Sequence, residues 1–272
     1  MPYHFLHKQC AGFINTPPLW NTEQFGVQQF EFPDIELSYF TPTPIPKNIR
    51  LGHQMEYICK QLLNHSKRYE VLLHNLPIYR GKQTLGEIDF ILKDTSTEQL
   101  IHVELTYKFY IINPDITDPI HNLIGPNKRD AFFAKIQKIK NKQFQLLHSF
   151  EGAQALQENN ISPTNIVHQA CFKGQIFKPY DAAIATLHPI NEDCIAGYWL
   201  RLDDLKKDAF ETFQFYIPSK SEWVIEPHED VEWIVHLQAI VALTTHMLRK
   251  NAPMVWMKKS ATDFKKFFVV WW

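Results

Sequence analysis

The sequence has few cysteines, almost no net charge and no motif of the common enzyme classes. Its cysteines, Cys10, Cys59, Cys171 and Cys194, are widely spaced and form no CxxC pair, which excludes zinc-finger and redox-motif spacings. Scattered cysteines suit a reducing compartment, so we expect a cytoplasmic protein. A formal net charge of −1 gives no global attraction to nucleic acid, so such affinity must come from local clusters of charge.

Long apolar segments are also missing. The first eight residues contain no cationic region followed by an apolar run, so we expect no signal peptide. The longest apolar stretch, near 231–248, is interrupted by polar residues such as His236 and Gln238, and it predicts a buried helix rather than a membrane span. There is no HExxH, GxSxG, GxxxxGK[ST] or GxGxxG, so serine-hydrolase, P-loop and Rossmann functions have no support.

What the chain does contain is enough apolar material for a large core. Its 272 residues are 45% hydrophobic and 14% aromatic, which fits one large domain or two small ones. Residues 1–49 are rich in proline and aromatics and predict an irregular arm with at most a short helix. We place a core domain at 50–160 and an α+β part at 161–272, which could pack with the core as one unit.

The periodicity of apolar residues predicts the elements of both parts. In order, they are a helix at 51–63, strands at 70–79, 85–93 and 99–109, helices at about 129–149 and 150–159, strands at 166–177, 194–201 and 211–216, a helix at about 229–249, and strands at 253–258 and 264–271. Apolar and charged residues alternate in the strands at 85–93 and 99–109. We therefore expect both strands to be half-buried, with their charged faces open to form a site.

Two carboxylates fifteen residues apart are the most informative feature of the chain. Asp89 and Glu104 lie on the polar faces of those two strands, and a turn-rich stretch at 93–97 separates them. This pattern predicts a hairpin with one acid on each of two neighbouring strands. Two converging carboxylates can hold a hard cation such as Mg²⁺, and such a cation can activate water against a phosphodiester.

Two further acids are candidates for the same site. Glu56 lies on a half-buried flank of the helix at 51–63, where an unpaired charge is costly, and this favours a third metal ligand. An ordinary ion pair with Lys60, at the favoured i,i+4 spacing, is the alternative. Glu87 shares the face of Asp89 and could act through a bound water. Any one of these acids, taken alone, is more often a solvated residue or a salt-bridge partner.

Basic residues follow the acids along the chain. Lys108 shares a face with Glu104, but their Cα atoms would be about 13 Å apart at the rise of a strand. Lys135, or no lysine, is the alternative for the cation beside a phosphate. Gln143 falls on the apolar stripe of the helix at 129–149 and is expected to point inward. A basic stripe on that helix region could track a phosphate backbone or be a solvated face; its members are Lys128, Arg129, Lys135, Lys138 and Lys142.

His74 and His102 lack metal-ligand spacing and are interpreted as structural.

The ordered set of a helical Glu, a strand Asp, a strand Glu and a basic helix with an inward Gln resembles the PD-(D/E)XK nuclease superfamily. More closely, the chain resembles the bacterial family called domain of unknown function 1853. The segments that carry the resemblance are 50–56, 74–77, 84–90, 102–110, 125–130, 142–143, 172–177 and 267–270.

The resemblance implies an α/β fold with a mixed central sheet flanked by helices, and a Mg²⁺- or Mn²⁺-dependent nuclease of the restriction-endonuclease type. Glu56 matches the helical acid, Asp89 the first strand acid, and Glu104 the acid of the (D/E)XK element, and all three are expected to bind the metal. Gln143 resembles the glutamine on the following helix in exonuclease-like branches of the superfamily.

One position departs from that pattern. The residue two after Glu104, where the family has lysine, is Thr106, so Lys108 must take the catalytic role or the lysine is missing. The alternative function is a non-catalytic module that binds nucleic acid or protein on a degenerate nuclease fold. We expect nucleic acid as the partner, with DNA favoured over RNA, no membrane, and a protein partner left open.

Overall fold

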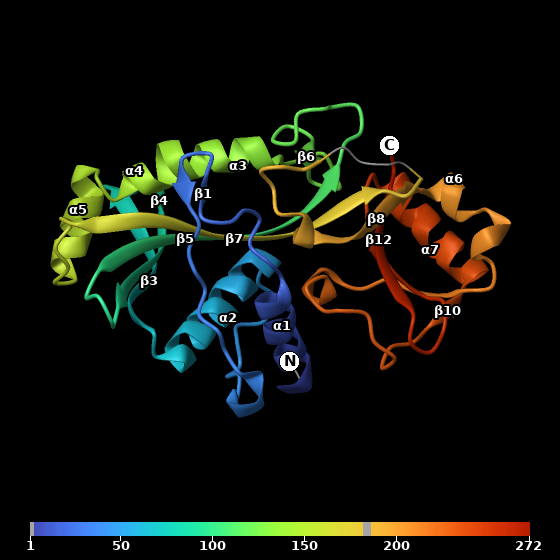
Figure 1. Ribbon diagram of the computed structural model, residues 1–272, viewed down its shortest axis with the longest axis horizontal. Coiled ribbons are helices and arrows are strands. Elements are labelled where there is room, and N and C mark those ends of the chain that lie inside the picture. The colour runs from blue at the N-terminus through green and yellow to red at the C-terminus, as the bar shows by residue number, and fades with distance from the viewer. Residues whose placement is uncertain (1–2, 182–185) are drawn as a thin grey trace. The chain divides into compact units, whose positions relative to one another are not determined.

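The computed structural model describes residues 3–181 and 186–272. The protein belongs to the α/β class, as predicted, with parallel and antiparallel strand pairs in its central sheet and helices flanking them (Figure 1). The chain divides into two compact units: unit 1 is Met1–Tyr107 with Ala134–Lys173, and unit 2 is Lys108–Phe133 with Gly174–Trp272. Strands β5 (Leu100–Ile112) and β7 (Ile166–Pro179) each begin in unit 1 and end in unit 2.

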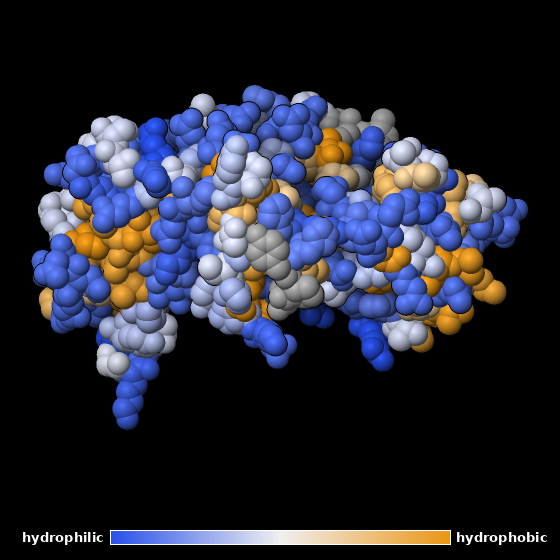
Figure 2. Space-filling model, turned by 90° about the horizontal axis from the view of Figure 1, so that it is seen from below, coloured by the Kyte–Doolittle hydropathy of each residue, from blue (hydrophilic) through white to orange (hydrophobic). Residues whose placement is uncertain are grey.

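Unit 1 is built on an antiparallel hairpin, β3 (Tyr69–Arg80) and β4 (Gln83–Asp94), with the first part of β5 beside β4. The strands predicted at 70–79, 85–93 and 99–109 are therefore confirmed. β3 is the outermost strand and most of its residues are only half-buried; Figure 2 shows a hydrophobic patch at the end of unit 1 that carries it. The other elements of unit 1 are α1 (Tyr3–Asn15), β1 (Glu23–Gln24), β2 (Val27–Gln28), η1 (Leu37–Tyr39), α2 (Leu51–Ser66), most of α3 (Phe132–Lys138), η2 (Ile139–Gln143), α4 (Phe144–Leu146) and α5 (Phe150–Glu158).

β4 and β5 are buried on both faces, so the expectation of half-buried strands with an open charged face was wrong. In unit 1, α1 and α2 lie on one side of the sheet, and α4 and α5 lie on the other (Figure 1). α2 packs against β3, and η2 and α4 pack against β4. Because helices cover both faces, the side chains of Asp89 and Glu104 are only 8% and 0% exposed.

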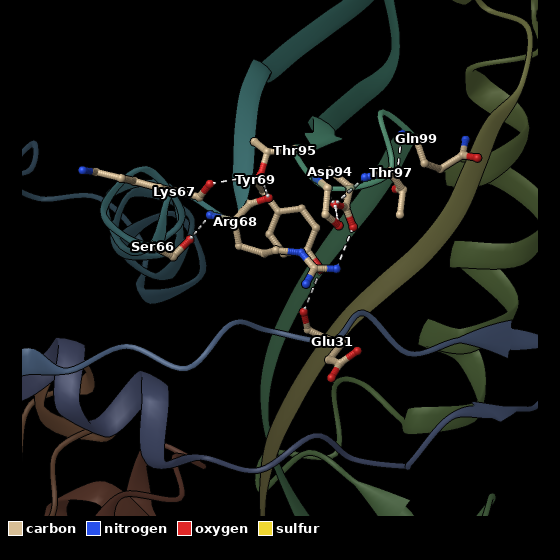
Figure 3. A network of polar contacts seen from close by, with 10 residues as sticks. Glu31, Ser66, Lys67, Arg68, Tyr69, Asp94, Thr95, Thr97 and Gln99 are labelled. Atoms are coloured by element: carbon tan, nitrogen blue, oxygen red, sulfur yellow. Dashed lines mark hydrogen bonds and ion pairs between the residues drawn. The ribbon is translucent and has the colours of Figure 1, made fainter.

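The turn between β4 and β5 is held by Asp94, the last residue of β4. Its Oδ1 accepts hydrogen bonds from the backbone N–H of Ser96 at 2.8 Å and from Ser96 Oγ at 2.6 Å. Its Oδ2 accepts one from Arg68 Nη2 at 2.8 Å, and Arg68 lies in the connection between α2 and β3 (Figure 3). One carboxylate therefore ties the start of β3 to the end of β4 and stabilises the register in which β4 meets β5.

The helix predicted at 129–149 is interrupted. It begins at Phe132, passes into the π-helical segment η2, and ends in the short helix α4. The predicted apolar stripe of Phe132, Ile136 and Ile139 is buried, as expected. A π-helical turn accommodates an extra residue, and such turns occur often at functional sites. Here the π-helical turn ends at Gln143.

Unit 2 packs its own core around Phe215, Leu243, Val255 and Phe267. Its strand pairs β7–β8 and β8–β12 are parallel, and β12–β11, β11–β9 and β9–β10 are antiparallel. The helix expected from 229 begins only at His236, and the expectation that it is buried was wrong. Only Ala239 and Leu243 of α7 are buried, and three of its large apolar side chains are exposed: Leu237, Val241 and Leu248. The described part of the chain has no helix with the length and apolar character needed to cross a membrane. The elements of unit 2 are β6 (Leu123–Ile124), η3 (Glu192–Cys194), β8 (Ile195–Arg201), α6 (Leu202–Leu205), η4 (Asp208–Phe210), β9 (Gln214–Tyr216), η5 (Lys220–Glu222), β10 (Ile234–Val235), α7 (His236–Leu248), β11 (Met254–Lys258) and β12 (Phe264–Val270).

Candidate functional site

The pairing of β4 with β5 brings Asp89 and Glu104 together in unit 1. β4 pairs with β5 through Phe90 and Val103, so the next step along both strands sets Asp89 opposite Glu104. Asp89 Oδ2 accepts a hydrogen bond of 2.9 Å from the backbone N–H of Leu105. We call Asp89 and Glu104 the carboxylate pair.

Burial makes the charged form of this pair costly. Desolvation, and then the neighbouring Glu104 carboxylate, hold the pKa of Asp89 well above its usual range. Desolvation likewise raises the pKa of Glu104 to about 7, against the opposing effect of the Lys135 charge. A cation that reaches the two acids would stabilise their ionised form, which burial disfavours. The pair is therefore electrostatically prepared to receive positive charge.

Gln143 points inward, as its place on the helix stripe predicted, and donates from Nε2 to Glu104 Oε2. Its Oε1 accepts a hydrogen bond of 3.0 Å from Lys135 Nζ. An ammonium group can only donate, so the amide oxygen of Gln143 must face Lys135 and its NH₂ must face the carboxylate. Lys135 thus determines which end of the amide reaches Glu104.

A cavity of about 330 Å³ opens beside the pair. Its acidic lining comes from α2 and β4, and its basic lining comes from α3 and the π-helical segment. The ionisable residues that line it are His53, Glu56, Glu87, Asp89, Lys135, Lys138 and Lys142. Acids on one wall and lysines on another could together accommodate a cation and a phosphate group.

Glu56 lies at this cavity but has partners of its own. Its Oε2 receives hydrogen bonds from His53 Nδ1 at 2.9 Å and from Asn75 Nδ2 at 3.1 Å. No pattern in the sequence indicated Asn75 as a site residue. It lies in β3 between His74 and Leu76, the partners of Phe90 and Ile88 in β4. Its φ is +52°, a left-handed conformation that is unusual for a strand residue other than glycine. No local sequence pattern indicates that conformation.

The donor set fits a hard cation, although it is not a ready-made metal centre. Within residues 3–181 and 186–272, no three His, Cys, Asp or Glu side chains lie close enough to form one, so Glu56 is not gathered with the pair into a cluster and its role as a third ligand stays a prediction. Mg²⁺ needs only one or two carboxylates when waters complete its shell. In the same described residues, Asn75 Oδ1 is buried without a hydrogen-bond partner. A buried amide oxygen of this kind needs a donor or a cation.

The predicted basic residues are divided between the units, and three of them lie in unit 2. Lys108 belongs to unit 2, where its Nζ lies 2.6 Å from Asp130 Oδ2. Lys128 and Arg129 are also in unit 2, and the Lys128 ammonium lies 3.7 Å from the centre of the Trp272 ring. The three lysines at the cavity are those of the helix itself. In the slot where lysine was expected, the Thr106 hydroxyl is buried and has no partner among the described residues.

His102, interpreted as structural from the sequence, is in direct contact with the pair. Its Nε2 lies 3.0 Å from Glu104 Oε1, and the His102 side chain is completely buried. The signal was present in the sequence, because residues two apart on a strand share a face.

These features define an α/β protein with a buried carboxylate pair beside a mixed-charge cavity. The chain belongs to the family described as Domain of unknown function (DUF1853), whose model matches residues 36–270. No curated protein and no solved structure gives a significant match to the chain.

Proposed function

We propose that the protein is a Mg²⁺- or Mn²⁺-dependent nuclease of the PD-(D/E)XK type, which hydrolyses phosphodiester bonds in nucleic acid, with DNA favoured over RNA. The observation that carries this proposal is the buried carboxylate pair. The pKa values of both acids are raised by burial, and leaving two such groups in the core costs stability unless a cation compensates them. A role in folding alone would favour apolar residues at these positions.

The side chains around the pair take complementary roles in the proposal. Asp89 and Glu104 would hold the cation, and Gln143 keeps the Glu104 carboxylate in place. Glu56 and Asn75 would hold water at the edge of the cavity. The bound cation would polarise a phosphoryl oxygen and lower the pKa of a water molecule.

The lysines of the helix supply the positive charge that a phosphate backbone needs. Lys135 is linked to Glu104 through the Gln143 amide, and its charge opposes the raised pKa values of both acids. We assign to Lys135 the role of the lysine that Thr106 replaces. Lys138 and Lys142, which line the same cavity, would bind flanking phosphates, and such contacts make affinity fall with rising salt.

The test is a calorimetric titration of Mn²⁺ into the wild type and into Asp89→Asn and Glu104→Gln, with cleavage of mixed DNA and RNA measured on the same samples. Wild type should bind Mn²⁺ and cleave, and both variants should lose binding and turnover. Glu98→Gln is the matched control, since Glu98 is an exposed acid of the same hairpin, paired with Lys93, and should behave as wild type. A wild type that binds no Mn²⁺ would refute the metal role of the pair.

A second function, a binding module without catalysis, is favoured by one observation. Thr106 occupies the lysine slot, and Lys108 is engaged with Asp130. This alternative predicts that the wild type binds Mn²⁺ and labelled DNA without cleaving it. In that case Lys138→Ala/Lys142→Ala should weaken DNA binding and reduce its salt dependence, as measured by fluorescence anisotropy.

A further inference from the structure

Three histidines form a continuous file from the surface of unit 1 to the carboxylate pair. His148 is exposed, and its Nε2 lies 2.8 Å from His168 Nε2. His168 Nδ1 lies 2.9 Å from His102 Nδ1. His102 Nε2 then reaches Glu104 Oε1 at 3.0 Å. Both ring nitrogens of His168 and both ring nitrogens of His102 therefore take part in these contacts.

The rings are held in place by aromatic packing. Phe144 stacks on His168 with ring centroids 4.9 Å apart, and meets His102 edge-on at 5.7 Å. The phenylalanine follows Gln143 directly, so the π-helical segment positions both the amide and the ring that contact this region. Movement of any one ring is restricted by its neighbours.

Two ring nitrogens that face each other at 2.8 or 2.9 Å share a single hydrogen, because two N–H groups or two lone pairs would repel each other. His102 is completely buried, where a charged imidazolium is costly. A neutral imidazole has one N–H and one lone pair. Each inner ring can therefore donate on one side only and must accept on the other.

This constraint determines the direction of hydrogen-bond donation along the three histidines. A Glu104 that binds a cation is ionised and can only accept, so His102 must have its hydrogen on Nε2. Its Nδ1 then accepts from His168 Nδ1, and His168 Nε2 accepts from His148 Nε2. The state of the inner rings is determined by contacts at both ends.

We propose that His168 is a positioning residue, which holds His102 in the Nε2–H tautomer and thereby orients the Glu104 carboxylate toward the cation. His148 ends the file at the surface, where water can take its place. This inference rests on the proposed function, because it gives Glu104 the role of a metal ligand. Groups that hydrogen-bond a metal ligand fix its orientation, and their loss commonly weakens metal binding about 10–100-fold.

The first test reads the tautomers directly. Long-range ¹H–¹⁵N spectra of the metal-free protein at pH 8.5 distinguish protonated ring nitrogens from lone-pair nitrogens. Wild type should show His102 with hydrogen on Nε2 and His168 with hydrogen on Nδ1. His168→Leu should give mixed tautomers at His102. His168→Asn, whose Nδ2 occupies nearly the place of Nδ1, should restore the single tautomer.

The second test measures Mn²⁺ affinity by calorimetry in the same variants. We expect about a tenfold loss in His168→Leu and recovery in His168→Asn. In a His102→Gln background the donor to Glu104 is an amide without tautomers, so His168→Leu should then have no further effect. His148→Ala, at the exposed end, should lose less than twofold, since water can donate to His168 Nε2.

The outcomes separate the two proposals. A wild-type His102 with hydrogen on Nδ1, or a His168→Leu variant that keeps both tautomer and affinity, would overturn the role of the histidines. A loss in His168→Leu that persists in the His102→Gln background would mean that His168 is only a packing residue. A wild type that binds no Mn²⁺ would refute the proposed function, while its spectrum would still decide the tautomers.

Discussion

Two aspartates of β4 lie in opposite electrostatic environments. Asp94 accepts hydrogen bonds from Arg68, from the Ser96 hydroxyl and from backbone N–H groups, and these donors hold its pKa well below the usual range. Asp89 accepts one backbone hydrogen bond and faces Glu104, and burial raises its pKa. Both side chains are less than a tenth exposed, so burial alone does not explain the difference.

What separates the two aspartates is whether the fold supplies donors. The charge of Asp94 is balanced by groups that also close the turn between β4 and β5. The structure of this turn therefore explains why an aspartate lies there. The charge of Asp89 has no such balance and weakens the core. Residues that lower the stability of the protein and do not support its fold are expected mainly at functional sites. Substitutions at the two aspartates and their neighbours test that distinction.

Asp94→Ala should destabilise the protein by about 2 kcal/mol, because it removes the acceptor of the Ser96 groups that closes the turn. The loss is limited because Arg68 is half-exposed and can be solvated instead. Chemical denaturation in urea measures this loss. Mn²⁺ binding should survive in the folded variant, since the carboxylate pair is untouched. If Asp94→Ala were as stable as wild type, the network in Figure 3 would not hold the hairpin.

Glu104→Gln should change stability in a pH-dependent way. The Glu104 pKa rises from 4.5 to about 7 on folding, so between these values the folded protein binds more protons than the unfolded chain. Its contribution to stability is present below pH 4.5 and is lost as pH rises through 7. Each tenfold change in proton affinity is worth about 1.4 kcal/mol, and relaxation of the buried pair leaves an expected change of about 1–2 kcal/mol.

The measurement compares wild type and Glu104→Gln by urea unfolding at pH 5 and pH 8 with a chelator present. The two proteins should be similarly stable at pH 5, where Glu104 is protonated and resembles Gln. The variant should be the more stable at pH 8. The comparison between proteins cancels the titration of the buried histidines, which acts in both. An equal difference at the two pH values would show that Glu104 ionises normally.

The hairpin and its acids could be predicted because their signals are local. Alternation in two neighbouring segments, with a turn between them, was enough to set Asp89 and Glu104 on adjacent strands. The inward direction of Gln143 followed from its spacing on an apolar stripe. These predictions depend only on the repeat of a strand or a helix.

The rest of the site depends on tertiary structure that no local pattern contains. Alternating charge suggested an open face, and only the packed helices reveal that both faces are covered. The left-handed conformation of Asn75 arises between His74 and Leu76, which keep one register with β4, and asparagine adopts it without a sequence signal of its own. The link from His102 to His168 joins strands 66 residues apart, a separation that spacing rules do not reach.

Lys108 and Lys135, the two candidates for the cation beside a phosphate, also lie in different environments. Lys108 pairs with Asp130, and their side chains are 35% and 40% exposed, so Lys108→Met should cost less than about 1 kcal/mol and leave Mn²⁺ affinity and cleavage unchanged. Lys135→Met should leave the fold intact but reduce cleavage, because it removes the charge beside the carboxylate pair and the group that orients Gln143. Melting curves and cleavage rates for the two variants provide the measurement. A loss of cleavage in Lys108→Met with full activity in Lys135→Met would return the catalytic role to Lys108, and the cavity lysine would then be a solvated residue of the helix.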